Sequence, residues 1–313
     1  MKKNIILTGI MLLVAVMVSA QSYNMIVEKT DGSTITIPTS SIGQISFQKE
    51  GGGGDTPSGT GTFQGAKRVF GDNLMKKYAY QSSSSSNGKS WDYTYDSNGY
   101  ITRTDYADGY SSSYATIDYS GGSVVVFKSF DKADGSLISQ AVINIGSNGY
   151  ASSYSYTDDK GKEHVQEFTY NSDDQLTYIV EYTNGAKDWG YSFEYSDGDL
   201  VKATELGWEN DVLTDNEVCA NILYETSTQS KIDNVGGVME YDHMMHIDCG
   251  LDEIFPFGAL GKPSKHLPLL VTFGGSTINN SYTLDSAGRP TSATSARTSS
   301  SGSTSTYNIT WAW

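Results

Sequence analysis

The sequence has 313 residues, of which 36 are acidic and 21 are basic, so its formal net charge at pH 7 is −15. This balance excludes a nucleic-acid-binding function that depends on basic patches, and it disfavours binding to anionic membrane surfaces. The length allows one large domain or two ordinary domains. We interpret the acidity mainly as a property that keeps an exported protein in solution.

Residues 1–20 have the pattern of a secretory signal peptide. Lys2 and Lys3 form a basic start, residues 5–18 are mostly apolar, and Val18-Ser19-Ala20 is a small-residue cleavage site. The apolar run is too short for a membrane-spanning helix. No cysteine follows the cleavage site, so the signal is not that of a lipoprotein. We therefore expect an exported protein without a transmembrane helix, located in the periplasm, at the cell surface or outside the cell.

Residues 21–48 predict a small N-terminal β unit. Strands are expected at 23–28 and 33–37 around the turn Asp31-Gly32, and a third short strand ends near Phe47. The glycine-rich segment 49–66 has the composition of a flexible linker. These features place a domain boundary between the small unit and a second domain at 67–313.

The second domain repeats one hairpin. The stretch 93–102 reads Tyr-Thr-Tyr-Asp-Ser-Asn-Gly-Tyr-Ile-Thr, and related stretches stand at 143–150, 168–176, 193–200 and 282–289. A second series of turns interleaves with the first, at Asp108-Gly109, Asp134-Gly135, Lys160-Gly161 and Asn184-Gly185. Asn-Gly and Asp-Gly pairs supply the positive φ angles that tight hairpin turns need.

Turns spaced in this way leave no room for the helices that cross between parallel strands. The fold class is therefore all-β: a large curved antiparallel up-and-down meander, expected as an open or partly closed barrel. The pattern breaks at 207–276, where no turn continues the series. Within this insert, residues 238–260 are rich in Met, Ile and Phe, so we expect a short helical or irregular segment that packs on one face of the sheet.

Residues 261–268 read Gly-Lys-Pro-Ser-Lys-His-Leu-Pro, and they are followed by the hairpin at 282–288 and a final aromatic strand. Together with the Tyr-x-Tyr-Asp-x-x-Gly turns, this arrangement resembles a family of secreted Bacteroidetes proteins of unknown function with a porin-like antiparallel β fold. The resemblance covers roughly residue 67 to the end. It implies a curved antiparallel sheet and an exported location, and it supplies no catalytic residues.

One segment contains a dense set of metal-ligand residue types. Asp242, His243 and His246 stand close together, and histidines three residues apart share one face of a helix, where they can bind zinc or another transition metal. The alternative is that both histidines are structural residues of a packing helix. No other cofactor is expected.

Aromatic residues and cysteines give two further hypotheses. The domain contains many tyrosines, and Trp91, Trp189 and Trp208 are the candidate residues for stacking against a ligand. Cys219 and Cys249 are the only cysteines, and in an exported protein the pair is a candidate disulfide. The alternative is two buried free thiols.

The last strand alternates Tyr307, Ile309, Trp311 and Trp313, as the last strands of outer-membrane barrels often do. Such barrels need a continuous apolar outward band. Strands such as 151–156 instead place serine where lipid contact requires apolar side chains, so we favour a curved sheet that is not embedded in the membrane.

The leading functional hypothesis is a non-enzymatic binding or interaction module of the cell envelope, with a polysaccharide or another cell-surface ligand as its partner. One alternative is a carrier that holds an apolar ligand in the concave face of the sheet. Another is a carboxylate-dependent hydrolase, which leaves no spacing signature in a sequence. We find no Gly-x-Ser-x-Gly motif for nucleophilic catalysis.

Overall fold

The structure is a computed structural model of the chain, and it describes residues 24–28, 34–38, 61–85, 87–238, 241–245, 247–251 and 254–313. The chain divides into two compact units, residues 1–50 and 51–313. The expected signal peptide, the third strand of the small unit and residues 49–60 of the expected linker lie outside the described residues.

The first unit contains a β hairpin. Strands β1 (Asn24–Glu28) and β2 (Thr34–Pro38) pair antiparallel, with Asn24 opposite Pro38 and Glu28 opposite Thr34. Both strands are rich in β-branched residues, which favour extended backbone. The strands lie at the positions expected from the alternating sequence on either side of Asp31-Gly32.

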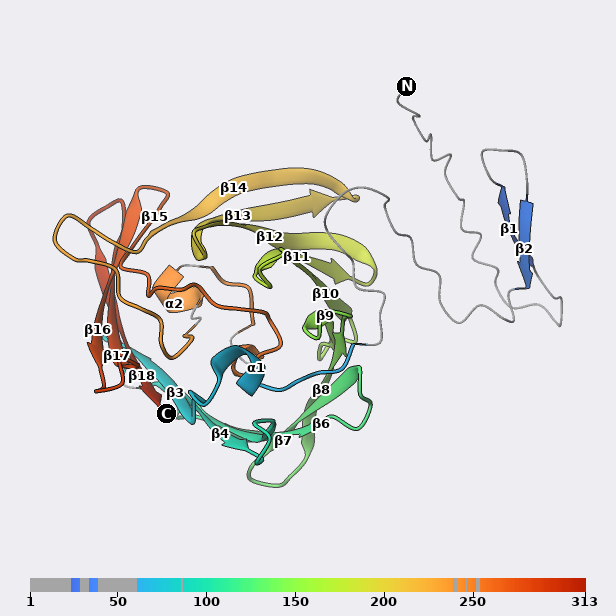
Figure 1. The fold of residues 1–313 in the computed structure, drawn as a ribbon, viewed down its shortest axis with the longest axis horizontal. Helices are drawn as coiled ribbons and strands as arrows, with labels where there is room; N and C mark the ends of the chain where they lie inside the picture. The colour runs from blue at the N-terminus through green and yellow to red at the C-terminus, as the bar shows by residue number, and fades with distance from the viewer. Residues whose placement is uncertain are drawn as a thin grey trace. The chain divides into compact units, whose positions relative to one another are not determined.

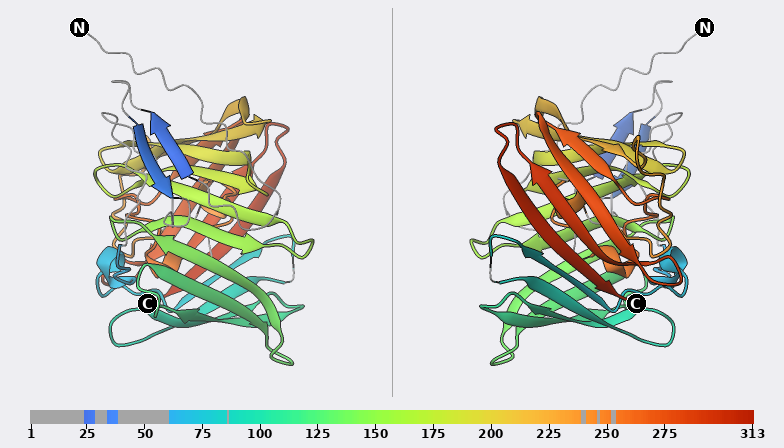
Figure 2. Two further views of the ribbon diagram at one scale, coloured as in Figure 1. Left: turned by 90° about the vertical axis from the view of Figure 1, so that its right-hand side faces the viewer. Right: turned by 90° about the vertical axis from the view of Figure 1, so that its left-hand side faces the viewer.

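The described part of the second unit forms a closed antiparallel barrel of sixteen strands, each hydrogen-bonded to its neighbours in the sequence. Figure 1 shows these strands as a ring, and Figure 2 shows them crossing the side of the barrel at a slant. The strands are β3 (Lys77–Ser82), β4 (Lys89–Tyr95), β5 (Ile101–Ala107), β6 (Ser112–Asp118), β7 (Val124–Asp131), β8 (Leu137–Ile145), β9 (Ala151–Thr157), β10 (Glu163–Tyr170), β11 (Leu176–Thr183), β12 (Ala186–Ser196), β13 (Asp199–Glu209), β14 (Val212–Leu223), β15 (Leu270–Phe273), β16 (Ser276–Leu284), β17 (Pro290–Thr298) and β18 (Thr304–Ala312).

The all-β meander expected from the repeat is confirmed, and the sheet closes completely. Strand β18 pairs with β3 from Tyr307 opposite Ser82 to Ala312 opposite Lys77. Closure satisfies the backbone N–H and C=O groups that an open sheet would expose at its two edges. The expectation of an open or partly closed barrel is corrected in this respect.

Successive hairpins alternate between the two ends of the barrel. The end at which β14 is connected to β15, which we call the plug end, carries the turns at 96–99, 146–149, 171–174 and 285–288. The opposite end, which we call the far end, carries those at 108–111, 132–135, 158–161, 184–185 and 210–211. At four of these turns a side-chain oxygen of the first residue accepts hydrogen bonds from the backbone N–H groups two and four residues later; these first residues are Asp96, Asp158, Asn171 and Asp285. The repeated Asp-x-x-Gly pattern is therefore turn chemistry.

The hairpins of the plug end also shift the strand register. Five of them have an irregularity where the second strand begins, for example between Thr169 and Tyr170 in the β10–β11 pair. A bulge places two residues of one strand opposite one residue of its partner. Leu176 and Ile179 are consequently both fully buried on the inner face, although strict alternation would place them on opposite faces.

The inner face of the barrel is apolar and the outer face is largely polar. In β18, Ile309 and Trp311 are buried, whereas the alternating residues Asn308, Thr310 and Ala312 are exposed. The aromatic row of the last strand therefore faces the interior. This strand does not present the apolar outward band that a lipid-embedded barrel needs.

The described residues of the segment 224–269, which we call the plug, occupy much of the interior. The plug connects β14 to β15 and contains the short helix α2 (Asp242–Met245) and the 3₁₀ turn η2 (Phe255–Phe257). Figure 1 shows α2 within the ring of strands. The fully or almost fully buried plug side chains include Met244, Ile247, Leu251, Phe257, Leu260 and Leu267. None of the described helices is long and apolar enough to cross a membrane.

The helix α1 (Lys67–Phe70) lies at the plug end, where two hydrogen bonds hold it to the hairpins. The Ala66 N–H donates to the Gly99 carbonyl, and the Arg68 guanidinium donates to the Asn148 carbonyl and lies 3.9 Å from the centre of the Tyr150 ring. Phe70 packs on the η2 ring of Phe255, with ring centres 5.4 Å apart. The segment before β3 thus covers the plug.

The expected insert at 207–276 is longer than the plug. Strand β13 continues to Glu209, and Asn210 and Asp211 form a two-residue turn with φ angles of 52° and 61°. Because this turn lacks glycine, the sequence pattern does not predict it, although Asn and Asp tolerate positive φ. The plug therefore replaces one hairpin turn of the plug end. Little of it is helical, because α2 has only four residues.

The side-chain acceptor at the start of a turn can be tested at Asn171. We expect Asn171→Ala to lower the free energy of unfolding by about 1–2 kcal/mol, because two backbone N–H groups lose their acceptor. Asn171→Asp should retain most of the stability, since Asp96 and Asp285 accept the same bonds in their hairpins. Urea unfolding measures both variants. Equal losses would show that the acceptor oxygen does not stabilise the turn.

Candidate ligand-binding site

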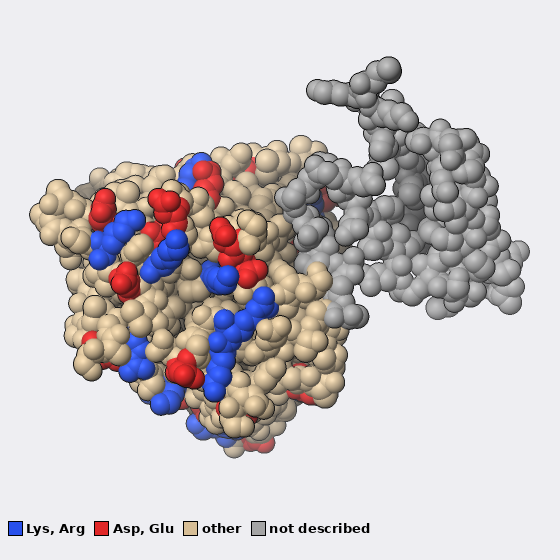
Figure 3. Space-filling view, in the orientation of Figure 1, with Lys and Arg blue, Asp and Glu red and all other residues tan. Residues whose placement is uncertain are grey.

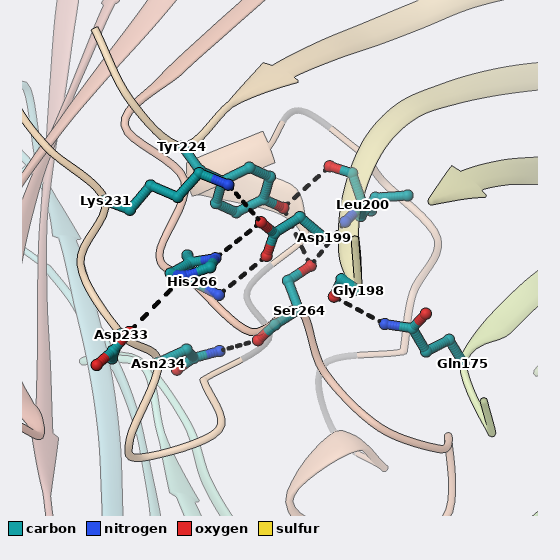
Figure 4. Close-up of polar contacts among 10 residues, drawn as sticks. All are labelled: Gln175, Gly198, Asp199, Leu200, Tyr224, Lys231, Asp233, Asn234, Ser264 and His266. Carbon is teal, nitrogen blue, oxygen red and sulfur yellow. Dashed lines mark hydrogen bonds and ion pairs between the residues drawn. The ribbon is translucent and has the colours of Figure 1, made fainter. Parts of the chain in front are cut away.

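A buried carboxylate joins the plug to the barrel wall at the plug end. Asp199 at the start of β13 accepts hydrogen bonds from the His266 backbone N–H at 3.0 Å and pairs with the His266 Nδ1 at 2.8 Å (Figure 4). The Lys231 ammonium lies 3.6 Å from the same carboxylate. His266 also approaches the exposed Asp233 at 3.6 Å through its Nε2.

Ser264 lies beside this pair but makes different contacts. Its hydroxyl oxygen accepts a hydrogen bond from the Leu200 N–H and lies 3.0 Å from the Tyr224 hydroxyl, which donates to the Leu200 carbonyl (Figure 4). The His266 Nε2 faces the Asp233 carboxylate at 3.6 Å, whereas the Ser264 hydroxyl contacts Tyr224 and the Leu200 N–H, so the histidine and the serine have different partners. The cluster fastens segment 261–268 to the wall.

Charged side chains of both signs mix over the plug-end face. Figure 3 shows Lys and Arg side chains lying next to Asp and Glu side chains on this face. Ion pairs include Lys262 with Asp174 at 3.2 Å and Arg289 with Asp285 at 2.7 Å. Such neutralised pairs indicate a structural surface more than a site for a charged ligand.

A second polar cluster lies on the inner face of β9–β11. The His164 Nδ1 is 2.9 Å from the Glu181 carboxylate and its Nε2 is 3.5 Å from Asp158, while the ring stacks on Tyr156 at 4.8 Å. Gln166 donates to the other Glu181 oxygen at 3.0 Å and to the Cys249 carbonyl of the plug at 3.4 Å.

These contacts shift the pKa of His164. The hydrogen bond to Glu181 is the largest cause, and together with Asp158 it raises the His164 pKa above its ordinary value of 6.5 against the opposing effect of burial. The protonated imidazole therefore stabilises the wall where it meets the plug.

The inner face of β4–β8 encloses a cavity near the far end. Its volume is about 350 Å³, which is toward the lower end of the usual size of ligand sites. Aromatic rings, hydroxyl groups and one carboxylate line it. The lining residues are Trp91, Thr104, Tyr106, Ser111, Ser112, Ser113, Ala115, Phe127, Ser129, Asp131, Ile138 and Ser139.

A continuous group of rings forms the aromatic wall of the cavity. Trp91 on β4 packs against Tyr106 on β5 and Tyr78 on β3, with ring centres 5.1 Å and 5.3 Å apart. Tyr80 touches the same indole at 5.9 Å. Because its neighbours hold the indole from several sides, Trp91 is only 7 % exposed, and it offers the cavity the fixed part of its ring that they leave uncovered.

Thr104 supplies an unusual polar group to the cavity. The residue is only 6 % exposed, and its hydroxyl oxygen has no hydrogen-bond partner within the described part of the chain. A buried hydroxyl without a partner costs roughly 1–3 kcal/mol. Such a group beside a cavity favours a ligand that restores the missing hydrogen bond.

The structure brings only Trp91 of the three predicted tryptophans into this cavity. Trp189 on β12 packs on Tyr191 inside the barrel, with ring centres 5.8 Å apart. Trp208 on β13 lies over Gly190 on the opposite face of the sheet, where a Cβ atom on that glycine would stand 3.2 Å from the indole. The structure therefore does not bring the three tryptophans together, and a ligand-binding role of each stays a prediction.

The predicted metal ligands are only partly described. His243 is buried between the rings of Tyr80 and Tyr307, at 3.9 Å and 4.4 Å, and its Nε2 lies 3.5 Å from Asp242. His246 lies outside the described residues. The described residues contain no group of three or more His, Cys, Asp or Glu side chains placed to hold a metal ion. The metal site stays a prediction.

Cys219 on β14 and Cys249 in the plug are not joined by a disulfide in the structure. Burial, followed by the nearby Glu205 carboxylate, raises the pKa of the Cys219 thiol to about 11. The reactive thiolate is therefore scarce at neutral pH, which slows oxidation. The disulfide stays a prediction.

Nothing in the sequence marks Thr104, Tyr106 or Asp131 as site residues. Each stands in an ordinary alternating strand, and the chain contains many residues of the same types. The pairing of β4 with β5 places Trp91 opposite Tyr106 and Tyr93 opposite Thr104. Only Trp91 could be placed from the sequence. It stands near a far-end turn, and neighbouring strands bring their own side chains to the same end.

The plug-end fastening can be tested with two carboxylates that contact the same histidine. We expect Asp199→Ala to lower the free energy of unfolding by roughly 3 kcal/mol, because it leaves His266 and Lys231 without their buried partner. Asp233→Ala should change it little, since this carboxylate is exposed and exposed ion pairs contribute little. Denaturant unfolding of both variants provides the comparison, and similar effects would contradict this assignment.

The raised pKa of His164 predicts a pH-dependent contribution to stability. The contribution is fully present below the unfolded pKa near 6.5 and is lost as the pH rises through the higher folded pKa. We expect His164→Gln to flatten this part of the profile of unfolding free energy against pH. Glu181→Gln removes the main cause of the raised His164 pKa and should flatten the same part of the profile. Parallel profiles for the original chain and His164→Gln would argue against the predicted coupling.

Comparison with known proteins shows what this fold is similar to. No protein-family model and no curated protein matches the sequence. Among solved structures, a porin-like protein from Bacteroides uniformis matches with a TM-score of 0.60 and 17 % identity, over 76 % of this chain and 97 % of that chain. A porin-like protein from Bacteroides vulgatus covers 76 % of this chain and 98 % of that chain, at 16 % identity and a TM-score of 0.37. The chain therefore has a porin-like antiparallel barrel fold, in agreement with the resemblance seen in the sequence.

Proposed function

We propose that this chain is an exported, non-enzymatic binding protein of the cell envelope that holds a short carbohydrate in the cavity beside Trp91. The observation that carries the proposal is the lining of this cavity, in which the buried hydroxyl of Thr104 has no partner among the described residues and stands beside five serines and the ring pair of Trp91 and Tyr106. A hydroxyl group of the ligand would supply that partner after a small shift of the side chains that cover the Thr104 oxygen.

The other lining groups support the same class of ligand. The rings of Trp91 and Tyr106 offer apolar surface to one face of a sugar ring. The serine hydroxyls at 111–113, 129 and 139 donate and accept hydrogen bonds, as the hydroxyls of a sugar do. A cavity of about 350 Å³ suits one or two sugar units at the end of a longer chain.

The two alternative functions receive less support. A carrier for apolar ligands needs an apolar cavity, whereas the plug occupies the apolar interior and hydroxyl groups line the remaining space. A hydrolase of the glycosidase type needs two carboxylates flanking the bond. Among the residues that line the cavity, only Asp131 carries a carboxylate.

The envelope location follows from two supporting observations. The first twenty residues have the composition of a secretory signal, and the barrel resembles porin-like proteins from Bacteroides. The polar outer face of strands such as β18 favours a location outside the lipid core, in the periplasm, at the surface or beyond it. We therefore expect the purified chain to remain in solution without detergent.

Thr104→Val tests the binding function, because stability and binding should change in different directions. Replacing an unpartnered buried hydroxyl with a methyl group of similar shape should leave the melting temperature unchanged or raise it. The same change should weaken binding of any sugar that bonds to Thr104 by about tenfold. Calorimetric titration of the purified chain with a panel of monosaccharides and disaccharides measures the affinity.

Thr116→Val is the matched control, since Thr116 lies on the neighbouring strand β6 with its side chain exposed. It should leave sugar binding unchanged. The proposal is wrong if no sugar in the panel binds the original chain, or if Thr104→Val binds every sugar as tightly as the original chain does.

A further inference from the structure

The residues that line the cavity carry a negative charge and no positive charge. Asp131 is the one charged residue among those that line the cavity, and no Lys, Arg or His side chain lines it. The whole chain is also acidic, with a net charge of −15. A ligand that enters therefore meets one carboxylate and no cation among the residues that line the cavity, since the ammonium of the adjacent Lys132 pairs with Asp105 at 3.1 Å.

The backbone holds Asp131 in a defined position. The residue ends β7 and pairs with Ser113 of β6, and its Oδ1 accepts a hydrogen bond from the Ala133 N–H at 2.7 Å. Ser113 and Ser129 line the same cavity, so the carboxylate stands among hydroxyl groups that do not neutralise it. A carboxylate only accepts hydrogen bonds, so a ligand group beside it must donate one.

We propose that Asp131 is the specificity-determining residue of this cavity and that it selects neutral sugars over acidic sugars. The inference rests on the proposed binding function and names the class of sugar. A neutral sugar presents a hydroxyl group that donates to Asp131. A uronic acid has a carboxylate in place of one hydroxymethyl group, and two carboxylates in a partly enclosed site repel each other.

Matched pairs of sugars provide the experiment. We would titrate the purified chain with methyl glucoside and methyl glucuronide, and with methyl galactoside and methyl galacturonide, at neutral pH and low salt. At least one neutral member should bind, and its acidic partner should bind about tenfold more weakly or worse. High salt should narrow the difference by screening the repulsion without changing the affinity for the neutral sugar.

Asp131→Asn removes the charge but retains the Oδ1 acceptor for the Ala133 N–H. In this variant the ratio of the affinity for the neutral sugar to the affinity for its acidic partner should fall to near one. Asp118→Asn is the control for net charge, because Asp118 is exposed at the other end of the neighbouring strand β6 and does not line the cavity. It should leave the ratio unchanged.

The outcomes separate the two proposals. If no sugar binds the original chain, the proposed function fails. If neutral and acidic partners bind the original chain equally, or if Asp131→Asn leaves the ratio unchanged at an unaltered melting temperature, the binding function stands and the role of Asp131 is overturned. If Asp131→Asn fails to fold, the salt dependence of the ratio in the original chain decides: a ratio that ignores salt overturns the role.

Discussion

A ring of sixteen strands must be filled, and the rest of the structure depends on how this is done. Side chains alone fill a barrel of about eight strands, and wider barrels enclose a lumen. Here the inner face of the wall is apolar, with fully buried Ile143, Ile179 and Ile309, so it requires an apolar partner. Residues 224–269 provide it. The plug is therefore the core of the domain, because without it the apolar inner face of the strands would be exposed to water.

Filling a barrel with irregular chain creates a second requirement, because the buried backbone of the plug needs hydrogen-bond partners. Polar side chains of the wall supply them where the inner face is otherwise apolar. Asn280 donates to the carbonyls of Met244 and Pro268, and Ser295 donates to that of His243. The buried carboxylate of Asp199 similarly accepts the His266 N–H. Buried polar residues of this wall therefore mark contacts with the plug.

The sequence predicted the meander well, because turn chemistry is local. Asp96 and Asp285 make their bonds within five residues, and any copy of the motif reports the same hairpin. Which side chains face the interior, and whether the sheet closes into a barrel, could not be predicted in the same way. Bulges after the turns move residues such as Leu176 to the inner face, and the glycine-free turn at 210–211 hid the β13–β14 hairpin. The site depends on pairing between strands, so Trp91 alone was recognisable.

The position of the cavity follows from how the plug is connected. The plug leaves β14 and enters β15 at the plug end, and its contacts with α1 and the hairpins concentrate there. Toward the far end, the inner faces of β4–β8 change from apolar residues to serine, threonine and aspartate. Gln166, Asn280 and Ser295 each bond to a backbone carbonyl of the plug, whereas the hydroxyl of Thr104 has no hydrogen-bond partner among the described residues. The proposed ligand would account for a hydroxyl that has no partner among the described residues, because local departures from good packing are expected where a protein binds.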